Sequence, residues 1–191
     1  MERESIEYDV VVVGGGPSGL ASACKLKQLN QNLSVCLLEK GSEIGSHIIS
    51  GAVFEPETLF DLFPEEASSC PTLNTPVKRD DVYFLTGNKK SIKVPSWLTP
   101  KGLHNNGNYI ISLGELCQWI GERAVELGVD IFPGFPAQNY LLDKSGRVCG
   151  IATGDMGLDK QGNQKSTWTP GMDIYAKQTI FAEGSRGHLG K

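Results

Sequence analysis

The sequence lacks the usual features of a membrane-spanning, metal-binding or disulfide-stabilised protein. No apolar run approaches the ~20 residues that a spanning helix needs, and residues 1–5 are too acidic for a signal or transit peptide. The five cysteines are scattered without a C-x-x-C spacing, and the three histidines show no ligand spacing. We therefore expect buried free thiols in a reducing compartment, and neither a disulfide framework nor a metal site.

Positive charge is also scarce. The 191 residues carry 18 Lys and Arg against 22 Asp and Glu, a formal net charge of −4, which argues against nucleic acid as a partner. Hydrophobic residues make up 39% of the chain, enough for a sizeable core. Length and composition therefore predict one intracellular domain, or part of one.

A glycine motif near the N-terminus is the strongest signal present. An apolar strand over residues 6–13 runs into G-x-G-x-x-G at Gly14, Gly16 and Gly19, and a helical pattern follows over residues 21–29. In such a motif the first glycine permits a tight turn, the second lets a pyrophosphate approach, and the third lets helix and strand pack closely. The helix N-terminus then offers N–H groups and a positive dipole end to the phosphates.

A second apolar strand over residues 33–38 ends in Glu39, which lies 20 residues beyond Gly19. An acid at that position is placed to accept hydrogen bonds from adenosine ribose hydroxyls. The alternatives are that the glycines form only a tight connection and that Glu39 is a solvated acid. The complete strand, turn, helix, strand and acid pattern favours a dinucleotide site.

The rest of the chain predicts an α/β fold of Rossmann type, with a parallel sheet and an inserted antiparallel β meander at 133–176. The small-residue stretch 41–52 indicates backbone passing close to something bulky. Further expected elements are a capped amphipathic helix from Ser112 to Gly128, a parallel strand at 129–132, meander strands at 138–142, 148–153 and 173–176, a hairpin turn at 143–146, an exposed loop at 154–166, and a nucleotide-domain strand at 178–182.

Four motifs resemble the electron transfer flavoprotein-ubiquinone oxidoreductases, in order along the whole chain. They are Gly14 to Gly19, Gly45-Ser-His-Ile-Ile-Ser-Gly-Ala52, His104-Asn-Asn-Gly-Asn-Tyr109 and Ala182-Glu-Gly-Ser-Arg-Gly-His-Leu189. The first and last are shared with a broad flavoprotein group that includes aromatic hydroxylases and geranylgeranyl reductases. The two middle motifs are more specific to this family.

The resemblance implies an extended FAD molecule bound along these motifs. Glu183 and Gly184 stand where relatives carry an Asp-Gly pair beside the cofactor. The implied cofactor contacts are Gly14, Gly16, Pro17, Ser18 and Gly19 on the pyrophosphate, Glu39 and Lys40 on the adenosine side, Ser46, His47, Ser50 and Gly51 on the flavin side, and Glu183 and Gly184. No catalytic residue is named, because electron transfer needs a held and tuned flavin rather than an acid-base triad.

The resemblance also implies an electron-transferring-flavoprotein dehydrogenase, with reduced electron transfer flavoprotein as donor and ubiquinone as acceptor. A four-iron four-sulfur cluster is expected beyond Lys191, since its cysteine spacing does not occur in this chain. We thus read residues 1–191 as the N-terminal part of an FAD-binding domain that is discontinuous in a longer protein. The family is attached peripherally, at the cytoplasmic face of a bacterial inner membrane or the matrix side of the mitochondrial inner membrane.

One stretch has a composition that suits a membrane surface. Residues 78–101 hold six basic and two acidic residues, a local net charge of +4, together with Trp97, Leu98 and other apolar residues. Aromatic rings can enter the membrane–water interface while neighbouring lysines contact anionic headgroups. Together these contacts would attach the protein peripherally. The plainer interpretation is a two-stranded ribbon with core-facing aromatics and a solvated basic turn. We expect a membrane-facing hairpin insertion at 78–110.

Two other classes of function share parts of this pattern. An FAD-dependent monooxygenase or a geranylgeranyl-reductase-like enzyme would use the same scaffold with a substrate cavity and a nicotinamide cofactor. A non-catalytic dinucleotide-binding module would use only the glycine motif.

Overall fold

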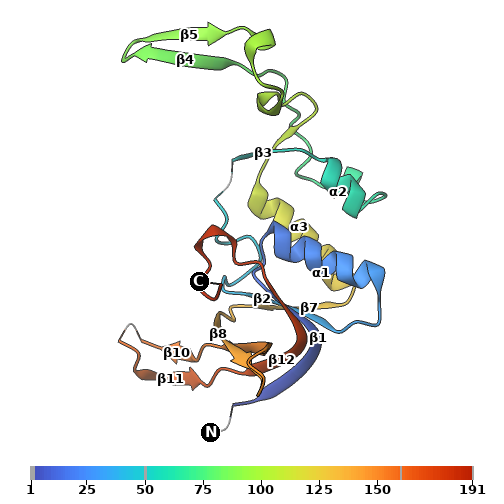
Figure 1. The fold of residues 1–191 in the computed structure, drawn as a ribbon, viewed down its shortest axis with the longest axis vertical. Coiled ribbons are helices and arrows are strands. Elements are labelled where there is room, and N and C mark those ends of the chain that lie inside the picture. Colours follow the sequence, from blue (N-terminus) through green and yellow to red (C-terminus); the bar gives the residue numbers. More distant parts are fainter. Residues whose placement is uncertain (1–2, 50, 160, 191) are drawn as a thin grey trace. The chain divides into compact units, whose positions relative to one another are not determined.

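The computed structural model describes residues 3–49, 51–159 and 161–190. Within it the chain forms two compact units (Figure 1). Unit 1 comprises Met1–Ile48 and Gly114–Lys191, and unit 2 comprises Ile49–Leu113. The glycine motif and Glu39 both lie in unit 1.

Unit 1 is built on a six-stranded sheet in the order β7-β2-β1-β12-β9-β8. The first four strands in this order run parallel, whereas β9 pairs antiparallel both with β12 and with β8. The bounds are β1 Ser5–Val13, β2 Val35–Glu39, β7 Val129–Pro133, β8 Ala137–Leu142, β9 Val148–Thr153 and β12 Asp173–Phe181. The expected Rossmann-like fold with a parallel sheet is confirmed.

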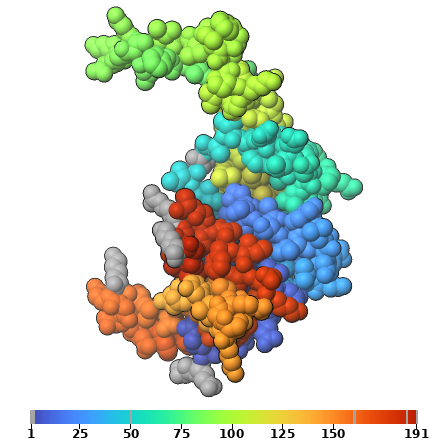
Figure 2. Space-filling view, in the orientation of Figure 1, coloured from blue at the N-terminus to red at the C-terminus, as the bar shows by residue number. Residues whose placement is uncertain are grey.

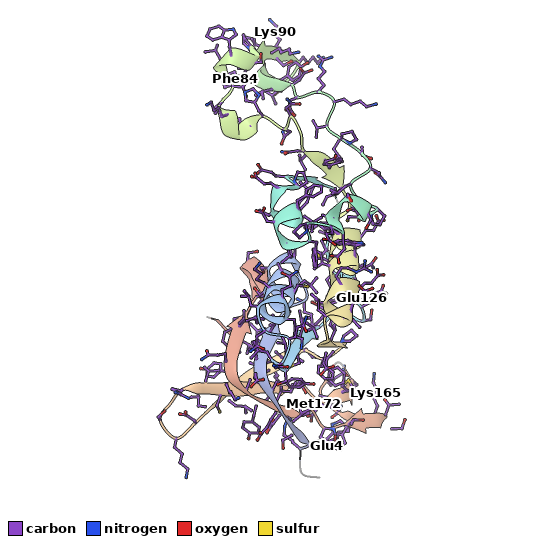
Figure 3. The ribbon with its side chains drawn as sticks, turned by 90° about the vertical axis from the view of Figure 1, so that its right-hand side faces the viewer. Glu4, Phe84, Lys90, Glu126, Lys165 and Met172 are labelled. Carbon is purple, nitrogen blue, oxygen red and sulfur yellow. The ribbon has the colours of Figure 1, made fainter. Side chains whose placement is uncertain are left out.

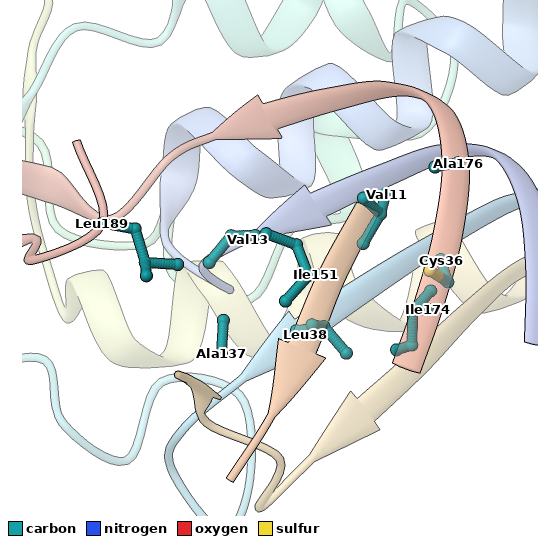
Figure 4. Packing of buried hydrophobic residues seen from close by; sticks show 9 residues of the cluster. All are labelled: Val11, Val13, Cys36, Leu38, Ala137, Ile151, Ile174, Ala176 and Leu189. Atoms are coloured by element: carbon teal, nitrogen blue, oxygen red, sulfur yellow. The ribbon is translucent and has the colours of Figure 1, made fainter. Parts of the chain in front are cut away.

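Both faces of the sheet are buried at β2 and at the second half of β1. Successive side chains in a strand point to opposite faces, so Val11 and Val13 lie on one face of β1 while Val10 and Val12 lie on the other, and all four are buried. Figure 4 shows the first face, where residues of β1, β2, β8, β9 and β12 pack with Leu189. Such runs of β-branched and aliphatic residues are typical of strands covered on both sides.

Two helices cover the other face. Helix α1 spans Pro17–Leu29 and contacts β1, β2 and β7. Helix α3 spans Leu113–Glu126 and buries Leu116, Ile120 and Ala124, as the amphipathic pattern predicted. The helix ends just before Gly128, as predicted. This glycine has φ +86°, a left-handed conformation that is common directly after a helix. The thiol of Cys24 in α1 lies 3.9 Å from the carbonyl oxygen of Ile120, so the two helices pack side by side.

The segments expected as two separate strands, at 173–176 and 178–182, form the single strand β12. This strand pairs parallel with β1 along its length and antiparallel with β9 over Asp173 to Tyr175. The meander and the nucleotide sheet are therefore one sheet. The sequence divides the strand at Lys177, a polar residue between the two apolar segments, although this side chain donates to Asp9 of β1 at 2.6 Å.

The predicted hairpin between β8 and β9 is present, with Gly146 at φ +83° and the Asp143 N–H donating to the Arg147 carbonyl at 2.8 Å. The expected loop at 154–166 is wrong. Strands β10 Met156–Leu158 and β11 Gln164–Thr169 form a second hairpin there. The side chains of this hairpin are mostly exposed. Its sequence therefore lacks the alternation of apolar and polar residues from which a strand is predicted.

Unit 2 contains short elements and an exposed ribbon. Strands β3 Ala52–Phe54 and β6 Tyr109–Ile111 pair antiparallel, and helix α2 covers Glu57–Leu62. Strands β4 Val82–Gly87 and β5 Lys90–Val94 form the ribbon. Three 3-10 turns, η1 Ala67–Ser69, η2 Ser96–Leu98 and η3 Lys101–Leu103, complete the unit.

Candidate dinucleotide-binding site

The glycine turn after β1 is held by backbone packing. Gly14 has φ +111°, and a Cβ there would overlap the carbonyl oxygen of Ala182 at the end of β12. A Cβ on Gly19 would overlap the carbonyl oxygen of Gly14 and lie 3.3 Å from the Cβ of Ala182. Both glycines are thus required by the fold, as the motif predicts for a tight turn and a close helix approach.

Gly16 is different from its neighbours in the motif. It is the N-cap of α1 with φ −81° and ψ 179°, an extended conformation that any residue adopts. A Cβ there would have no heavy atom within 4 Å among the described residues. Neither strain nor packing therefore requires glycine at this position of the motif.

Within the described part of the chain, the first turn of α1 carries no acidic residue and no side-chain cap. Pro17 takes the first helical position. Pro17 and Ser18 are exposed. The first-turn N–H groups and the positive dipole end are therefore available to an anion.

Glu39 ends β2 beside this turn, and its carboxylate has two backbone partners. Oε2 accepts the N–H of Gly15 at 2.8 Å, and Oε1 accepts the N–H of Gly41 at 2.7 Å. Each oxygen retains capacity for a further hydrogen bond. The structure thus brings Glu39 to the glycine turn, as predicted, and adds a backbone role that the sequence did not indicate.

The segment after Glu39 packs tightly against helix α3 within unit 1. Gly45 has φ +85°, and a Cβ there would lie 2.5 Å from the carbonyl oxygen of Gly114 in α3. The close approach expected for this small-residue stretch is therefore to the chain itself. Lys40 and His47 are exposed, and the Ser46 hydroxyl donates to the Glu43 carbonyl at 2.9 Å. Ser50 lies outside the described residues, and Gly51, with φ +104°, belongs to unit 2.

Glu183 and Gly184 form a sharp turn after β12. Gly184 has φ +69°, and the Glu183 carboxylate accepts the Leu189 N–H at 3.1 Å within the same turn. The Ala182 N–H donates to the Val13 carbonyl at 2.8 Å, so this turn begins beside the glycine turn. The carboxyl ends of β1, β2 and β12 thus bring together the glycine motif, Glu39 and Glu183.

The cysteines are structural. All five are free, and all but Cys149 are buried. Burial raises the pKa of the Cys24 and Cys36 thiols to about 12 and that of Cys117 to about 11, so these thiols stay protonated and unreactive. No group of three or more His, Cys, Asp or Glu residues is arranged to hold a metal ion in the part of the chain that the structure describes.

The β4–β5 ribbon of unit 2 exposes apolar side chains (Figure 2, green). Leu85 is 75% exposed, and Tyr83, Phe84 and Ile92 are exposed as well. In the 3-10 turns that follow the ribbon, Trp97 of η2 is 80% exposed, and Leu98 and Leu103 are also exposed. Figure 3 labels Phe84 and Lys90, which both belong to this ribbon. The aromatics of the ribbon therefore face outward rather than into a core of unit 2. None of the helices in the described residues is long and apolar enough to cross a membrane.

Some charged side chains of this ribbon form ion pairs, whereas the lysines at its turn are exposed. Asp81 pairs with Arg79 and, at 2.6 Å, with Lys93 across the two strands. Hydrogen bonds from Lys93 and Arg79 hold the pKa of Asp81 below its ordinary value. Lys89 and Lys90 stand exposed at the turn of the ribbon. Asp80 accepts the Asn105 N–H at 2.6 Å and thereby fixes the base of the ribbon to the segment after η3.

Comparison with known proteins agrees with this geometry. Residues 12–65 match the family model described as an NAD(P)-binding Rossmann-like domain. Electron transfer flavoprotein-ubiquinone oxidoreductase from Pseudomonas aeruginosa is 56% identical over the whole chain, and the mitochondrial protein from Bos taurus is 47% identical. This chain is a homologue of the electron transfer flavoprotein-ubiquinone oxidoreductases. The resemblance inferred from the four motifs is confirmed, while the chain spans only 36% and 31% of the length of these two relatives.

Solved structures show the same fold in more distant proteins. A geranylgeranyl bacteriochlorophyll reductase-like protein from Thermoplasma acidophilum superposes with a TM-score of 0.64 at 22% identity, covering 94% of this chain and 40% of its own. A myxobacterial chondrochloren halogenase, described as a variant of FAD-dependent halogenases, gives 0.65 at 18% identity and covers 96% and 38%. At these identities the likeness establishes the fold alone.

Proposed function

We propose that this chain is the FAD-holding part of an oxidoreductase that accepts electrons from reduced electron transfer flavoprotein and passes them to ubiquinone. The observation that carries the proposal is Gly16, a glycine that neither its φ nor its packing requires, at the uncapped N-terminus of α1. The names of the relatives at 56% and 47% identity supply the donor and the acceptor. FAD supplies the redox chemistry, since it takes up and releases electrons reversibly.

The chain's own residues would bind and orient the cofactor. The N–H groups at the start of α1 would hold the pyrophosphate, with Gly14, Pro17, Ser18 and Gly19 shaping the turn. Glu39, with Lys40, would face the adenosine ribose. The remaining proposed contacts are Ser46, His47, Ser50 and Gly51 on the flavin side, with Glu183 and Gly184 beside the cofactor.

An electron-transfer assay tests this proposal directly. In the protein at its full natural length, we expect sustained oxidation of reduced electron transfer flavoprotein, beyond the amount that the enzyme itself can accept, only when a ubiquinone analogue is present. NADPH, with or without an aromatic or isoprenoid substrate, should not be consumed. Stoichiometric NADPH oxidation on adding such a substrate would instead assign the chain to the monooxygenases or reductases that share its fold. A colourless protein that bound NAD would identify a dinucleotide-binding module.

We also propose that the ribbon of unit 2 contacts an anionic membrane surface, at the cytoplasmic face of a bacterial inner membrane or the matrix side of the mitochondrial one. Its exposed apolar tips and the lysines at its turn support this contact. A few lysines contribute about 1 kcal/mol each near anionic lipid, and a buried apolar side chain adds a comparable amount. Attachment through this ribbon should be weak, reversible and sensitive to salt.

Sedimentation of the full-length protein with liposomes that contain ubiquinone and anionic lipid measures this contact. Both Trp97→Ser/Leu98→Ser and Lys89→Glu/Lys90→Glu should lower the bound fraction, the second mainly at low salt. Lys144→Glu/Lys165→Glu, a matched charge change in unit 1, should not. If neither variant of unit 2 alters binding, neither the ribbon nor the turn η2 that follows it touches the membrane.

A further inference from the structure

The carboxylate of Glu39 connects turns that follow different strands. Its Oε2 holds Gly15, in the turn after β1, and its Oε1 holds Gly41, in the turn after β2. The backbone continues this connection to the turn after β7, where the Gly134 N–H donates to the Gly41 carbonyl at 2.7 Å and the Phe135 N–H donates to the Glu39 carbonyl at 3.1 Å. The Glu39 side chain thus links two turns at the carboxyl edge of the sheet, and backbone hydrogen bonds join the third turn to them.

Gly15 is enclosed on the side that faces this carboxylate. A Cβ on Gly15 would lie 2.9 Å from Glu39 Oε2 and 2.5 Å from the Cδ1 of Ile44. The side chain of Ile44 also lies beside α3, since it is 3.5 Å from the position that a Cβ on Gly121 would take. The Gly15 peptide is therefore fixed by a charged acceptor and by packing, before any ligand contributes.

The glycine turn that Glu39 contacts would have high conformational freedom without this hydrogen bond. Gly14, Gly15 and Gly16 are consecutive glycines, which lose more conformational freedom on ordering than any other residue type. An acceptor that orders them in the folded protein removes part of that entropic cost from ligand binding. A hydrogen bond from a backbone N–H to a carboxylate is also roughly twice as strong as one between neutral groups.

We propose that Glu39 is a positioning residue, which holds the pyrophosphate-binding turn in its binding geometry in addition to any contact with the ribose. The inference rests on the proposed dinucleotide site and deepens it. If Glu39 acted through ribose hydroxyls alone, its removal would not affect a nucleotide that lacks them. If it also orders the turn, its removal weakens every ligand whose pyrophosphate binds there.

The affinities of each variant for ADP and for a dideoxy-ADP that lacks both ribose hydroxyls, measured by competition binding, separate the ribose contact from the positioning role. The assay uses the full-length protein stripped of flavin. We expect Glu39→Ala to weaken the dideoxy nucleotide about tenfold and ADP by a larger factor, because the variant loses the turn in both cases and the ribose contact only with ADP. Glu39→Gln, whose amide oxygen can still accept one N–H, should restore part of the dideoxy-ADP affinity.

Tyr8→Phe serves as the control for a general loss of stability, since it removes a 2.9 Å hydrogen bond to Asp130 elsewhere in unit 1. It should leave both affinities unchanged. Equal affinity of wild type and Glu39→Ala for dideoxy-ADP would overturn the positioning role and leave the site in place. A loss of dideoxy-ADP affinity in Tyr8→Phe as large as that in Glu39→Ala would also overturn the positioning role. Failure of the wild-type protein to bind either nucleotide would overturn the site itself, and the positioning role with it.

Discussion

Replacing Gly16 with valine is expected to remove most of the bound flavin while leaving the fold of the flavin-free protein intact. The valine side chain would meet no heavy atom of the described chain within 4 Å at its Cβ, and the extended backbone at this position accepts any residue. Valine is a poorer N-cap than glycine, so we expect a stability loss of about 1 kcal/mol at most. The same side chain would occupy the proposed pyrophosphate position.

Flavin occupancy after gentle purification and the unfolding temperature of the stripped protein are the two readouts. Gly102→Val is the matched control, because Gly102 also has open space around it but lies in unit 2. It should keep its flavin. Unchanged flavin content in a folded Gly16→Val protein would refute the placement of the cofactor.

Gly19→Ala is expected to produce the opposite result, a large loss of stability that does not depend on flavin. The added Cβ would overlap the carbonyl oxygen of Gly14, and the atoms that must move are backbone atoms of the turn. Either α1 shifts away from the sheet or the turn breaks, at a cost of about 3 kcal/mol or more. Chemical denaturation of the stripped protein measures this cost.

Gly121→Ala is its matched control in α3. A Cβ there would be 3.5 Å from the side chain of Ile44, which is ordinary contact. Alanine in a helix interior is preferred over glycine by roughly 1 kcal/mol, so this variant should be neutral or slightly stabilised. A Gly19→Ala protein as stable as Gly121→Ala would contradict the close helix approach.

The sequence predicted those parts of the fold that local pattern encodes. Apolar runs identified β1 and β2, the short segment 129–132 was predicted as β7, and the Asp143 to Gly146 turn identified the β8–β9 hairpin. It did not predict β10 and β11, whose stability comes from pairing with each other and not from a buried face. Nor did it predict β12 as one strand, because pairing with β1 outweighs its polar residues.

The same limit applies to individual side chains. The charge of Lys27 predicts an exposed position on α1, yet it is only 7% exposed, and its ammonium donates to the Gln31 and Leu33 carbonyls at 2.7 and 2.9 Å. Such burial depends on where the chain returns after the helix. Glu39 was identified from its spacing, but its two backbone partners depend on how the turns after β1 and β2 meet. Spacing can name a site residue, whereas its hydrogen-bond partners follow from tertiary structure.

The absorption spectrum of the gently purified full-length protein tests the central claim most directly. We predict the bands of oxidised flavin, at one FAD per chain, and their loss together with the FAD in Gly16→Val. A wild-type protein that is folded but shows no flavin bands, and gains none on addition of FAD, would contradict the account.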